Sequence, residues 1–182
     1  ITYDLAAAAD AAGKPVPERW IEVFSQVANL GAALGSQLIP ALSDHHDASV
    51  ARISHMPHLA AYAIAAAGEA GGPLAISLAA GSFRDCTRVA AAAPDMVMSW
   101  CENNTEPVLA ALDDVIERLT AARTQLATEG TAMDLAKTGQ IARVRYEARP
   151  AHRPIFRLRV GEGDWINQLK LAESVGGQVD VF

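Results

Sequence analysis

The sequence predicts a mainly α-helical protein that ends in a small β-α-β segment, and three observations support this. Hydrophobic residues make up 51% of the 182 residues, with alanine supplying much of that share, whereas aromatic residues make up only 5%. Small apolar residues with high helix propensity favour closely packed helices over a sheet sandwich. Apolar residues also recur at helical spacing along most of the chain. The length suffices for one domain, or for one domain and a fragment of another.

The first strong helical pattern covers residues 18–34, where apolar side chains form one stripe of an amphipathic helix. Pro17 lies at the start of this pattern, and Gly31 and Gly35 loosen its end. Residues 36–40 are interpreted as a very short extended segment.

The next helix is predicted to begin at Ser43 or Asp44 and to run to about Gly68. It contains four of the five histidines, at positions 45, 46, 55 and 58. Pro57 lies in the middle of this helix. Because proline lacks an amide hydrogen and its ring clashes with the preceding turn, we expect a kink between Ile53 and Pro57.

The remaining elements follow a loop at 69–73. A short helix is predicted over 74–81, then a break at Gly81 and Ser82, a helix over 83–93, and a long helix over 95–130 that Pro107 bends. Such a long helix favours packing against a partner subunit. Residues 133–149 are weakly helical. Strands at 154–160 and 178–182 flank a helix over 164–177, with Asp164 as its cap, and we interpret this segment as an appendage without a specific function.

Composition excludes several classes of function. The net charge of −6 argues against a nucleic-acid partner, because phosphate backbones are bound by clustered lysine and arginine. No apolar stretch reaches the roughly 20 residues that a membrane span needs. Cys86 and Cys101 form no CxxC pair, and no secretory leader is apparent, which indicates a cytoplasmic setting. No glycine-rich phosphate-binding fingerprint is present, so a nucleotide site is not expected within this chain.

The histidines fit the pattern of metal ligands poorly. His55 and His58 lie about 60° apart on a helix, and neither the HExxH motif nor the i, i+4 pair of zinc sites is present. Asp85 is the one obvious distant candidate for a further ligand, so no metal site is expected. Taken singly, each histidine suits a hydrogen-bonded helix residue, and Asp85 with Arg88 suits an ordinary i, i+3 ion pair.

The order of the elements favours a ligand pocket instead. A kinked helix with histidines is followed by a glycine break and then by a helix with Arg88 in its second turn. Free backbone amides at a helix start, together with an arginine, favour an anion such as a carboxylate. The residues therefore indicate a helical pocket for a small ligand that bears a carboxylate.

Three stretches of sequence carry a resemblance to a known family. "HDASVARISHMPHLAAYAIA" from residue 46, "AGSFRDCTRVAAAAPDM" from residue 80 and "ENN" from residue 102 resemble the C-terminal domain of prephenate dehydrogenases, a family that includes arogenate and cyclohexadienyl dehydrogenases. The resemblance is strong over 43–104 and extends from 17 to about 126. It implies a helical dimerisation domain like the C-terminal domain of 6-phosphogluconate dehydrogenase.

The resemblance also implies a domain organisation and a reaction. Residues 1–42 would be the end of, or the connection from, a nucleotide-binding domain, 43–130 the substrate-binding and dimerisation domain, and 131–182 an appendage. The family oxidises and decarboxylates prephenate to 4-hydroxyphenylpyruvate in tyrosine biosynthesis, with NAD or NADP as the hydride acceptor. The catalytic histidine and the nucleotide fingerprint lie upstream in the family, so this chain alone is expected to be an inactive part of a homodimer.

Residue by residue, the resemblance assigns roles to the motif positions. Arg88 matches the arginine that binds a substrate carboxylate, and His58 matches the histidine at the side-chain end of the substrate, which in some members takes part in feedback by tyrosine. Gly81 and Asp85 match positions in the pocket wall, where Asp85 could orient Arg88 or a histidine. The supporting positions are His46 and His55. No catalytic residue and no metal ligand is assigned within this chain.

Further positions bear on substrate choice. Asn104 matches a frequent asparagine of the family and is assigned a structural role. Ser82 stands where many members have glycine, and Val97 stands where many have an aromatic residue that can line the pocket, whereas Trp100 is interpreted as core. Two alternatives remain open: an arogenate dehydrogenase, and a helical module that binds tyrosine or a related carboxylate without chemistry.

Overall fold

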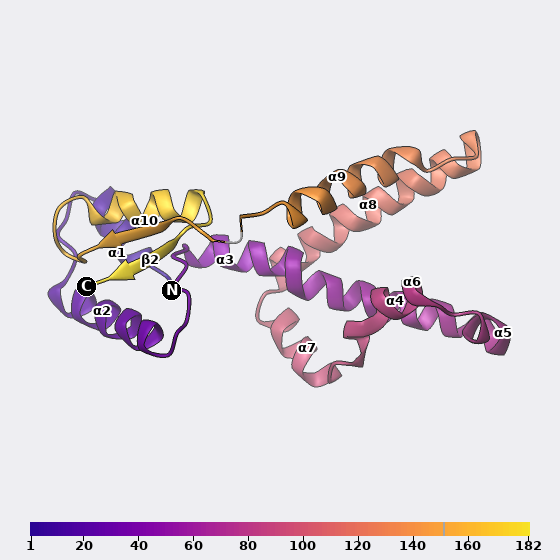
Figure 1. Cartoon of the computed structure of the whole chain (residues 1–182), viewed down its shortest axis with the longest axis horizontal. Helices are drawn as coiled ribbons and strands as arrows, with labels where there is room; N and C mark the ends of the chain where they lie inside the picture. Colours follow the sequence, from indigo (N-terminus) through magenta and orange to yellow (C-terminus); the bar gives the residue numbers. More distant parts are fainter. Residues whose placement is uncertain (151) are drawn as a thin grey trace. The chain divides into compact units, whose positions relative to one another are not determined.

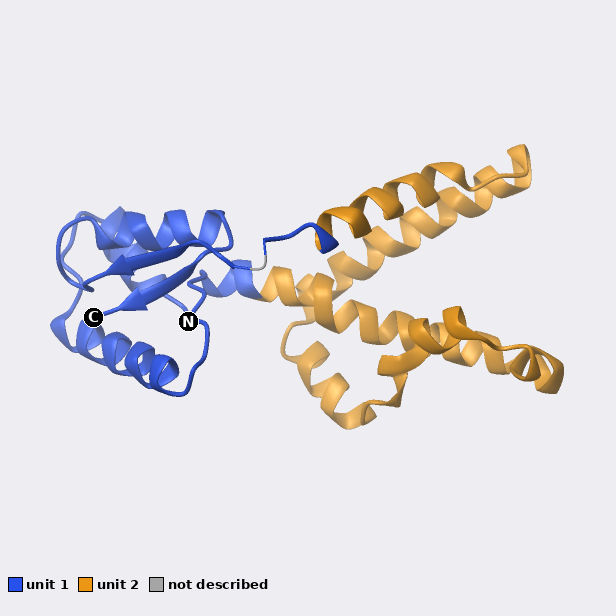
Figure 2. Cartoon of the chain, viewed as in Figure 1, with its two compact units in different colours: residues 1–46, 147–182 blue, residues 47–146 orange. Residues whose placement is uncertain are grey.

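The computed structural model describes residues 1–150 and 152–182, and these form two compact units (Figures 1 and 2). Unit 1 comprises residues 1–46 and 147–182, and unit 2 comprises residues 47–146. The mainly α-helical class with a small β-α-β segment is confirmed: helices α1 to α10 accompany one parallel sheet of two strands. The domain limits that the sequence suggests at residues 42 and 130 stay a prediction.

Unit 1 is built around the β-α-β segment. Strands β1 (Ile155–Leu158) and β2 (Gln178–Val181) pair in parallel, and α10 (Trp165–Ser174) connects them, as parallel strands require. Beside β2, the Val179 amide donates to the Leu38 carbonyl at 2.8 Å, so the extended segment predicted at 36–40 lies against the sheet. Helices α1 (Asp4–Ala11) and α2 (Glu18–Ala33) complete the unit.

One hydrophobic core joins the chain segments of unit 1. Phe24 and Ala28 of α2 and Leu169 of α10 are all buried in it. The Trp20 ring stacks on Phe24 with ring centroids 4.8 Å apart. The other buried members are Tyr3, Ala6, Leu158, Val160, Trp165, Ala172, Val179 and Val181. The C-terminal β-α-β segment therefore packs together with the N-terminal residues as one body.

Unit 2 consists of helices only. After α3 (Ser43–Val50), a π-helical turn η1 (Ala51–His55) leads into α4 (Met56–Glu69), and the short helices α5 (Gly72–Ser77) and α6 (Gly81–Thr87) follow. A 3₁₀ turn η2 (Arg88–Ala91), α7 (Pro94–Glu102), α8 (Thr105–Glu129) and α9 (Met133–Glu147) complete it. Its small core comprises Ala51 of η1 and Val108 and Ala111 of α8.

Where the sequence predicts a kink, the structure has the π turn η1. The Met56 amide donates to the Ala51 carbonyl, five residues back, and Pro57 lies at the start of α4. A π turn inserts one extra residue into the helix, and this makes room for a proline ring that would clash with an α-helical turn. A bend of the helix between Ile53 and Pro57 stays a prediction.

Two helix boundaries differ from the expectation. The helix predicted over 95–130 is in fact two helices: α7 ends at Glu102 and α8 begins at Thr105, with Asn103 and Asn104 between them. Pro107 is the third residue of α8, a first-turn position where proline costs no hydrogen bond, so it marks a helix start and not a bend. The helix break that the sequence predicts at Gly81 and Ser82 in fact lies just before Gly81, because Gly81 is the first residue of α6.

Candidate functional site

The candidate site is built on one stretch of unit 2 that includes η1 and the first turns of α4. His55 ends the π turn, and His58 and Tyr62 follow within α4. Because residues three and four apart are neighbours on a helix surface, these three side chains follow one another along one side of the helix. All three are half-buried.

His58 is anchored to its own helix. Its ring nitrogen Nδ1 lies 2.8 Å from the carbonyl oxygen of Ser54, four residues earlier. A carbonyl oxygen only accepts, so Nδ1 donates in this bond and the ring is held in one orientation.

Trp100 of α7 lies against both histidines. Its ring is nearly parallel to that of His55, at 23° with centroids 6.1 Å apart, and it meets the His58 ring edge to face at 79° and 5.6 Å. Such aromatic contacts stabilise ring orientations by roughly 0.5–1.5 kcal/mol beyond area burial. Val97, where many family members have an aromatic residue, is completely buried, so Trp100 one turn later supplies the aromatic ring beside the histidines.

Asn104 ends the break between α7 and α8 and is buried, at 8% exposure. Its side-chain nitrogen Nδ2 lies 2.8 Å from the Asp47 carbonyl oxygen and 3.3 Å from Nδ1 of His55. A polar side chain this buried needs partners, and both hydrogens of this amide nitrogen find one.

The segment that carries Arg88 is fixed to α4 at two places. The Tyr62 hydroxyl donates to the Ala92 carbonyl at 2.9 Å, which ties the end of η2 to α4. At Gly68, an added Cβ would lie 2.3 Å from the ring of Phe83, so α6 packs its aromatic ring directly on the backbone of α4. Arg88 begins η2, and its exposed side chain makes no hydrogen bond or ion pair with the part of the chain that the structure describes.

Two sequence-based expectations around Arg88 are wrong in their geometry. Arg88 does not lie in the second turn of an α-helix over 83–93, because α6 ends at Thr87 and Arg88 begins the 3₁₀ turn η2. Asp85 pairs with Arg84 at 3.1 Å and not with Arg88, and both partners are exposed. Gly81 has open space around it, with the nearest contact of an added Cβ at 3.9 Å from Arg84. The pocket-wall roles of Gly81 and Asp85 stay predictions.

His46 belongs to unit 1, where a second polar cluster surrounds the start of α3. The Glu173 carboxylate of α10 accepts from the Leu42 amide at 2.9 Å, from the Tyr3 hydroxyl, and pairs with Nδ1 of His45 at 2.9 Å. His46 is exposed and its amide donates to the Leu42 carbonyl at 2.9 Å. Its supporting role stays a prediction.

The cluster shifts the pKa values of its members. The hydrogen bond with Glu173 raises the pKa of His45 above its usual range. Partial burial of Glu173 opposes ionisation, but the hydrogen bonds from Tyr3, Leu42 and His45 outweigh it and lower the pKa of the carboxyl. Burial and the neighbouring carboxylate raise the pKa of Tyr3. The start of α3 is thus held by charged hydrogen bonds.

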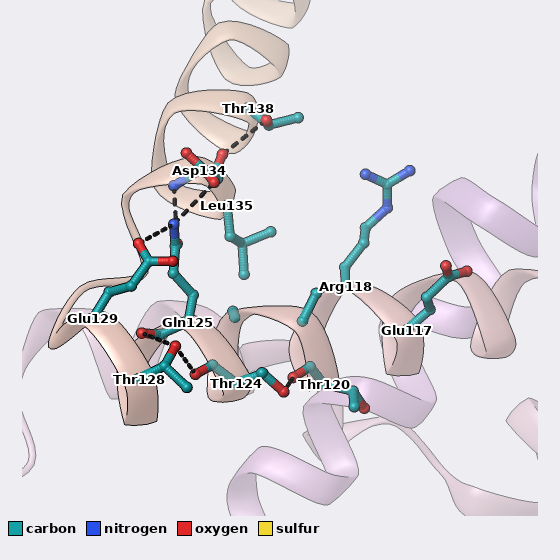
Figure 3. Close-up of a pocket in the computed structure, with 12 residues that line it drawn as sticks. Glu117, Arg118, Thr120, Thr124, Gln125, Thr128, Glu129, Asp134, Leu135 and Thr138 are labelled. Atoms are coloured by element: carbon teal, nitrogen blue, oxygen red, sulfur yellow. Dashed lines mark hydrogen bonds between the residues drawn. The ribbon is translucent and has the colours of Figure 1, made fainter.

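Three further findings concern a metal site, a membrane span and a groove. Over residues 1–150 and 152–182, no three His, Cys, Asp or Glu side chains lie close enough to hold a metal ion. Among the same residues, no helix combines the length and the apolar character that a membrane span requires. A groove between α8 and α9, with a volume of about 730 Å³, contains none of the expected site residues (Figure 3). Gln125 lines this groove, and its side-chain nitrogen donates to the carboxylates of Glu129 and Asp134.

Sequence reasoning does not single out Tyr62, and it does not predict the contacts of Trp100 and Asn104 with the histidines. A signal existed for Tyr62, which follows His58 by four residues and therefore shares its helix face. Asn104 lies between α7 and α8, so helical spacing gives no signal for its contact with His55.

Comparisons with known proteins identify the family of the chain. Residues 42–138 match the family model described as "Prephenate dehydrogenase, dimerization domain". That match assigns the helices of unit 2 to the class of dehydrogenase dimerisation domains. Because it covers more than half of the chain, the chain belongs to the prephenate dehydrogenase family.

Relatives of known function and structure extend the comparison. The chain is 31% identical over 115 residues to a cyclohexadienyl dehydrogenase of Zymomonas mobilis, covering 59% of this chain and 38% of that protein. It is 29% identical over 111 residues to a Bacillus subtilis prephenate dehydrogenase, covering 59% of this chain and 30% of that protein. The chain therefore spans about a third of the length of these relatives.

Two solved structures resemble the fold. A crystal structure from Corynebacterium glutamicum, assigned to a prephenate dehydrogenase, has a TM-score of 0.89 at 39% identity and covers 100% of this chain and 55% of that one. The arogenate dehydrogenase of Synechocystis has a TM-score of 0.60 at 25% identity, covering 69% of this chain and 48% of that one. The first likeness includes the C-terminal β-α-β segment.

Proposed function

We propose that this chain is the C-terminal substrate-binding and dimerisation part of an NAD(P)-dependent prephenate dehydrogenase. The observation that carries the proposal is that one continuous stretch, η1 and α4, holds the residues of both expected halves of the site. His55 ends η1 and His58 lies in α4, and through Tyr62 and Gly68 α4 also fixes the segment of Arg88. The family match over 42–138 supports the same assignment.

The chemistry of these residues suits a dianionic ligand. A guanidinium binds a carboxylate through paired, charge-assisted hydrogen bonds, and Arg88 has no competing partner among the described residues. His58 supplies a hydrogen-bonding group for the side-chain end of the substrate. NAD or NADP would accept the hydride and would be bound mainly by residues outside this chain. The 182 residues alone are therefore expected to show no turnover, since their share is to bind and orient the substrate.

Dimerisation is the second part of the proposal. The exposed face of α8 carries four large apolar side chains, Leu109, Ile116, Leu119 and Leu126, each 49–58% exposed. A stripe of apolar side chains on one helix is unfavourable in water unless another surface covers it. Given the family's dimerisation domain, we expect a second copy of the chain to cover this face.

The test uses the full-length protein and follows the absorbance of the reduced cofactor with prephenate and with arogenate. For Arg88→Ala, the Michaelis constant should rise by the equivalent of about 2–4 kcal/mol, because a charge-assisted carboxylate contact is lost. Arg84→Ala is the matched control. Arg84 is an exposed arginine of the same segment, and among the described residues it pairs with Asp85 alone, so the kinetics of this variant should stay near those of the wild type.

Each outcome has a clear meaning. Turnover with only one of the two substrates, lost in Arg88→Ala, would identify that substrate and the pocket together. Turnover that is indifferent to Arg88 would refute the assigned carboxylate site. Absence of turnover with either substrate, together with binding of tyrosine, would favour the helical module without chemistry.

A further inference from the structure

We propose that Asn104 is a positioning residue that fixes the tautomer of His55, while the carbonyl of Ser54 fixes the opposite tautomer of His58. In the neutral state, His55 then carries its hydrogen on Nε2 and His58 carries its hydrogen on Nδ1. The importance of this arrangement for ligand binding rests on the proposed function, but the two tautomers follow from contacts within the protein.

The orientation of the Asn104 amide follows from its buried partner. The Asp47 carbonyl oxygen, 2.8 Å away, can only accept, so the side-chain atom that faces it is the NH₂ group. The same nitrogen lies 3.3 Å from Nδ1 of His55, and it has a second hydrogen to donate. An amide nitrogen has no lone pair to offer, so Nδ1 of His55 is the acceptor and the ring hydrogen lies on Nε2.

His58 is subject to the reverse constraint. Its Nδ1 lies 2.8 Å from the Ser54 carbonyl oxygen, which again can only accept. Nδ1 of His58 therefore carries a hydrogen, and in the neutral ring Nε2 bears the lone pair. Ser54 belongs to η1, so the π turn that accommodates Pro57 also supplies this carbonyl.

Trp100 restricts both rings to these orientations. A half-turn of the His55 ring would place a carbon atom in front of Asn104, and the nearly parallel Trp100 ring at 6.1 Å limits that rotation. His58 meets the same indole edge to face at 5.6 Å. In the described part of the chain, no hydrogen bond occupies Nε2 of either ring.

The two neighbouring rings consequently differ in what they offer. His55 offers a donor at Nε2, which suits a carboxylate or carbonyl oxygen of a ligand. His58 offers an acceptor at Nε2, which suits a hydroxyl or an ammonium group. The two histidines thereby give the site one hydrogen-bond donor and one acceptor, a difference that the sequence does not reveal.

The experiment is ¹⁵N NMR on the full-length protein labelled in its histidines. Long-range ¹H–¹⁵N correlation spectra identify the protonated nitrogen of each ring at about pH 8, well above the ordinary histidine pKa of about 6.5. The signals are assigned with His55→Gln and His58→Gln. The wild-type rings should show opposite patterns, with Nε2 protonated in His55 and Nδ1 protonated in His58.

Two variants test the role of Asn104 itself. Asn104→Asp keeps the shape but replaces the donor by an acceptor, so the hydrogen of His55 should move to Nδ1 or occupy both nitrogens. Asn103→Asp is the control, because Asn103 is exposed and donates only to the Ser99 carbonyl, at 2.7 Å. It should leave both histidine patterns unchanged.

The proposal is overturned if the two wild-type rings share the same protonated nitrogen, or if His55 keeps its pattern in a folded Asn104→Asp protein. Should Asn104→Asp fail to fold, the wild-type spectrum decides the tautomers by itself. No ligand is present in these spectra, so failure here is distinct from failure of the Arg88 kinetics.

Discussion

Replacing Glu173 by alanine removes an acceptor that three donors share in unit 1. These donors are the Tyr3 hydroxyl, the Leu42 amide at 2.9 Å and Nδ1 of His45 at 2.9 Å. Through these bonds, Glu173 of α10 joins the start of α1 to the start of α3. The change should destabilise unit 1 and loosen the start of the helix that leads to the site histidines.

The magnitude follows from the burial of each donor. Tyr3 is 1% exposed, so its hydroxyl would lose its partner in a place that water does not easily reach. A buried donor left without a partner costs roughly 1–3 kcal/mol, and the half-buried Leu42 amide adds a smaller amount. His45 is exposed, so water replaces its contact. We expect Glu173→Ala to lower the free energy of unfolding by about 2–4 kcal/mol.

The loss of stability in Glu173→Ala should depend on pH. The pKa of Glu173 is lowered from its ordinary 4.5, so its contribution is complete above pH 4.5 and is lost as the pH falls through the folded-state value. The pKa of His45 is raised from its ordinary 6.5, so its contribution is complete below pH 6.5 and is lost as the pH rises through the folded-state value. The difference between wild type and Glu173→Ala should therefore be largest between pH 4.5 and 6.5.

Urea unfolding with tryptophan fluorescence measures this difference. Trp20 and Trp165 lie 6.0 Å apart in unit 1, and a Trp100→Phe background removes the signal of unit 2. The control is Glu162→Ala, an exposed carboxylate paired with Arg159 at 3.5 Å, which should cost less than about 1 kcal/mol. Equal losses for the two variants near pH 5.5, or a loss that does not vary with pH, would refute the reasoning.

Two further changes test unit 2. Gly68→Ala should cost about 1–3 kcal/mol in stability and raise the Michaelis constant, because its Cβ would lie 2.3 Å from the Phe83 ring and displace the segment with Arg88. The control is Gly139→Ala in α9, which should be neutral or slightly stabilising because its added Cβ meets nothing within 4 Å; thermal unfolding of both variants measures the difference. Leu119→Glu should weaken dimerisation at least tenfold, or about 1.4 kcal/mol, by sedimentation, and an unchanged dimer would exclude this face of α8.

The helices could be predicted because their signals are local. The apolar stripe of α2 and the proline and histidine pattern before α4 each lie within a few turns of chain. The break at Asn103 and Asn104 was missed because the apolar period continues across it. Pro107 was the available signal, since proline is favoured in the first turn of a helix and costs about 3 kcal/mol inside one.

The non-local contacts could not be derived from the same patterns. Nothing in the sequence near Leu38 indicates that the Val179 amide donates to its carbonyl, or that Tyr3 and Glu173 meet across almost the whole chain. Parallel pairing requires a crossover and leaves no short-range turn signal. For this reason the C-terminal β-α-β segment looked separate in the sequence, although it shares a core with residues 1–46.

The resemblance to the family points to the histidines and the arginine as site residues, but it does not indicate the contacts that hold them in place. Arg88 is not positioned by its own helix, since α6 ends one residue before it. Its place depends on Tyr62 and Gly68, and both belong to the helix that carries His58. The stretch from η1 through α4 therefore positions both the histidines and the arginine, so a shift of α4 would move every proposed ligand contact together. Substrate binding should accordingly be more sensitive to the packing of α4 than to the exposed residues that surround Arg88.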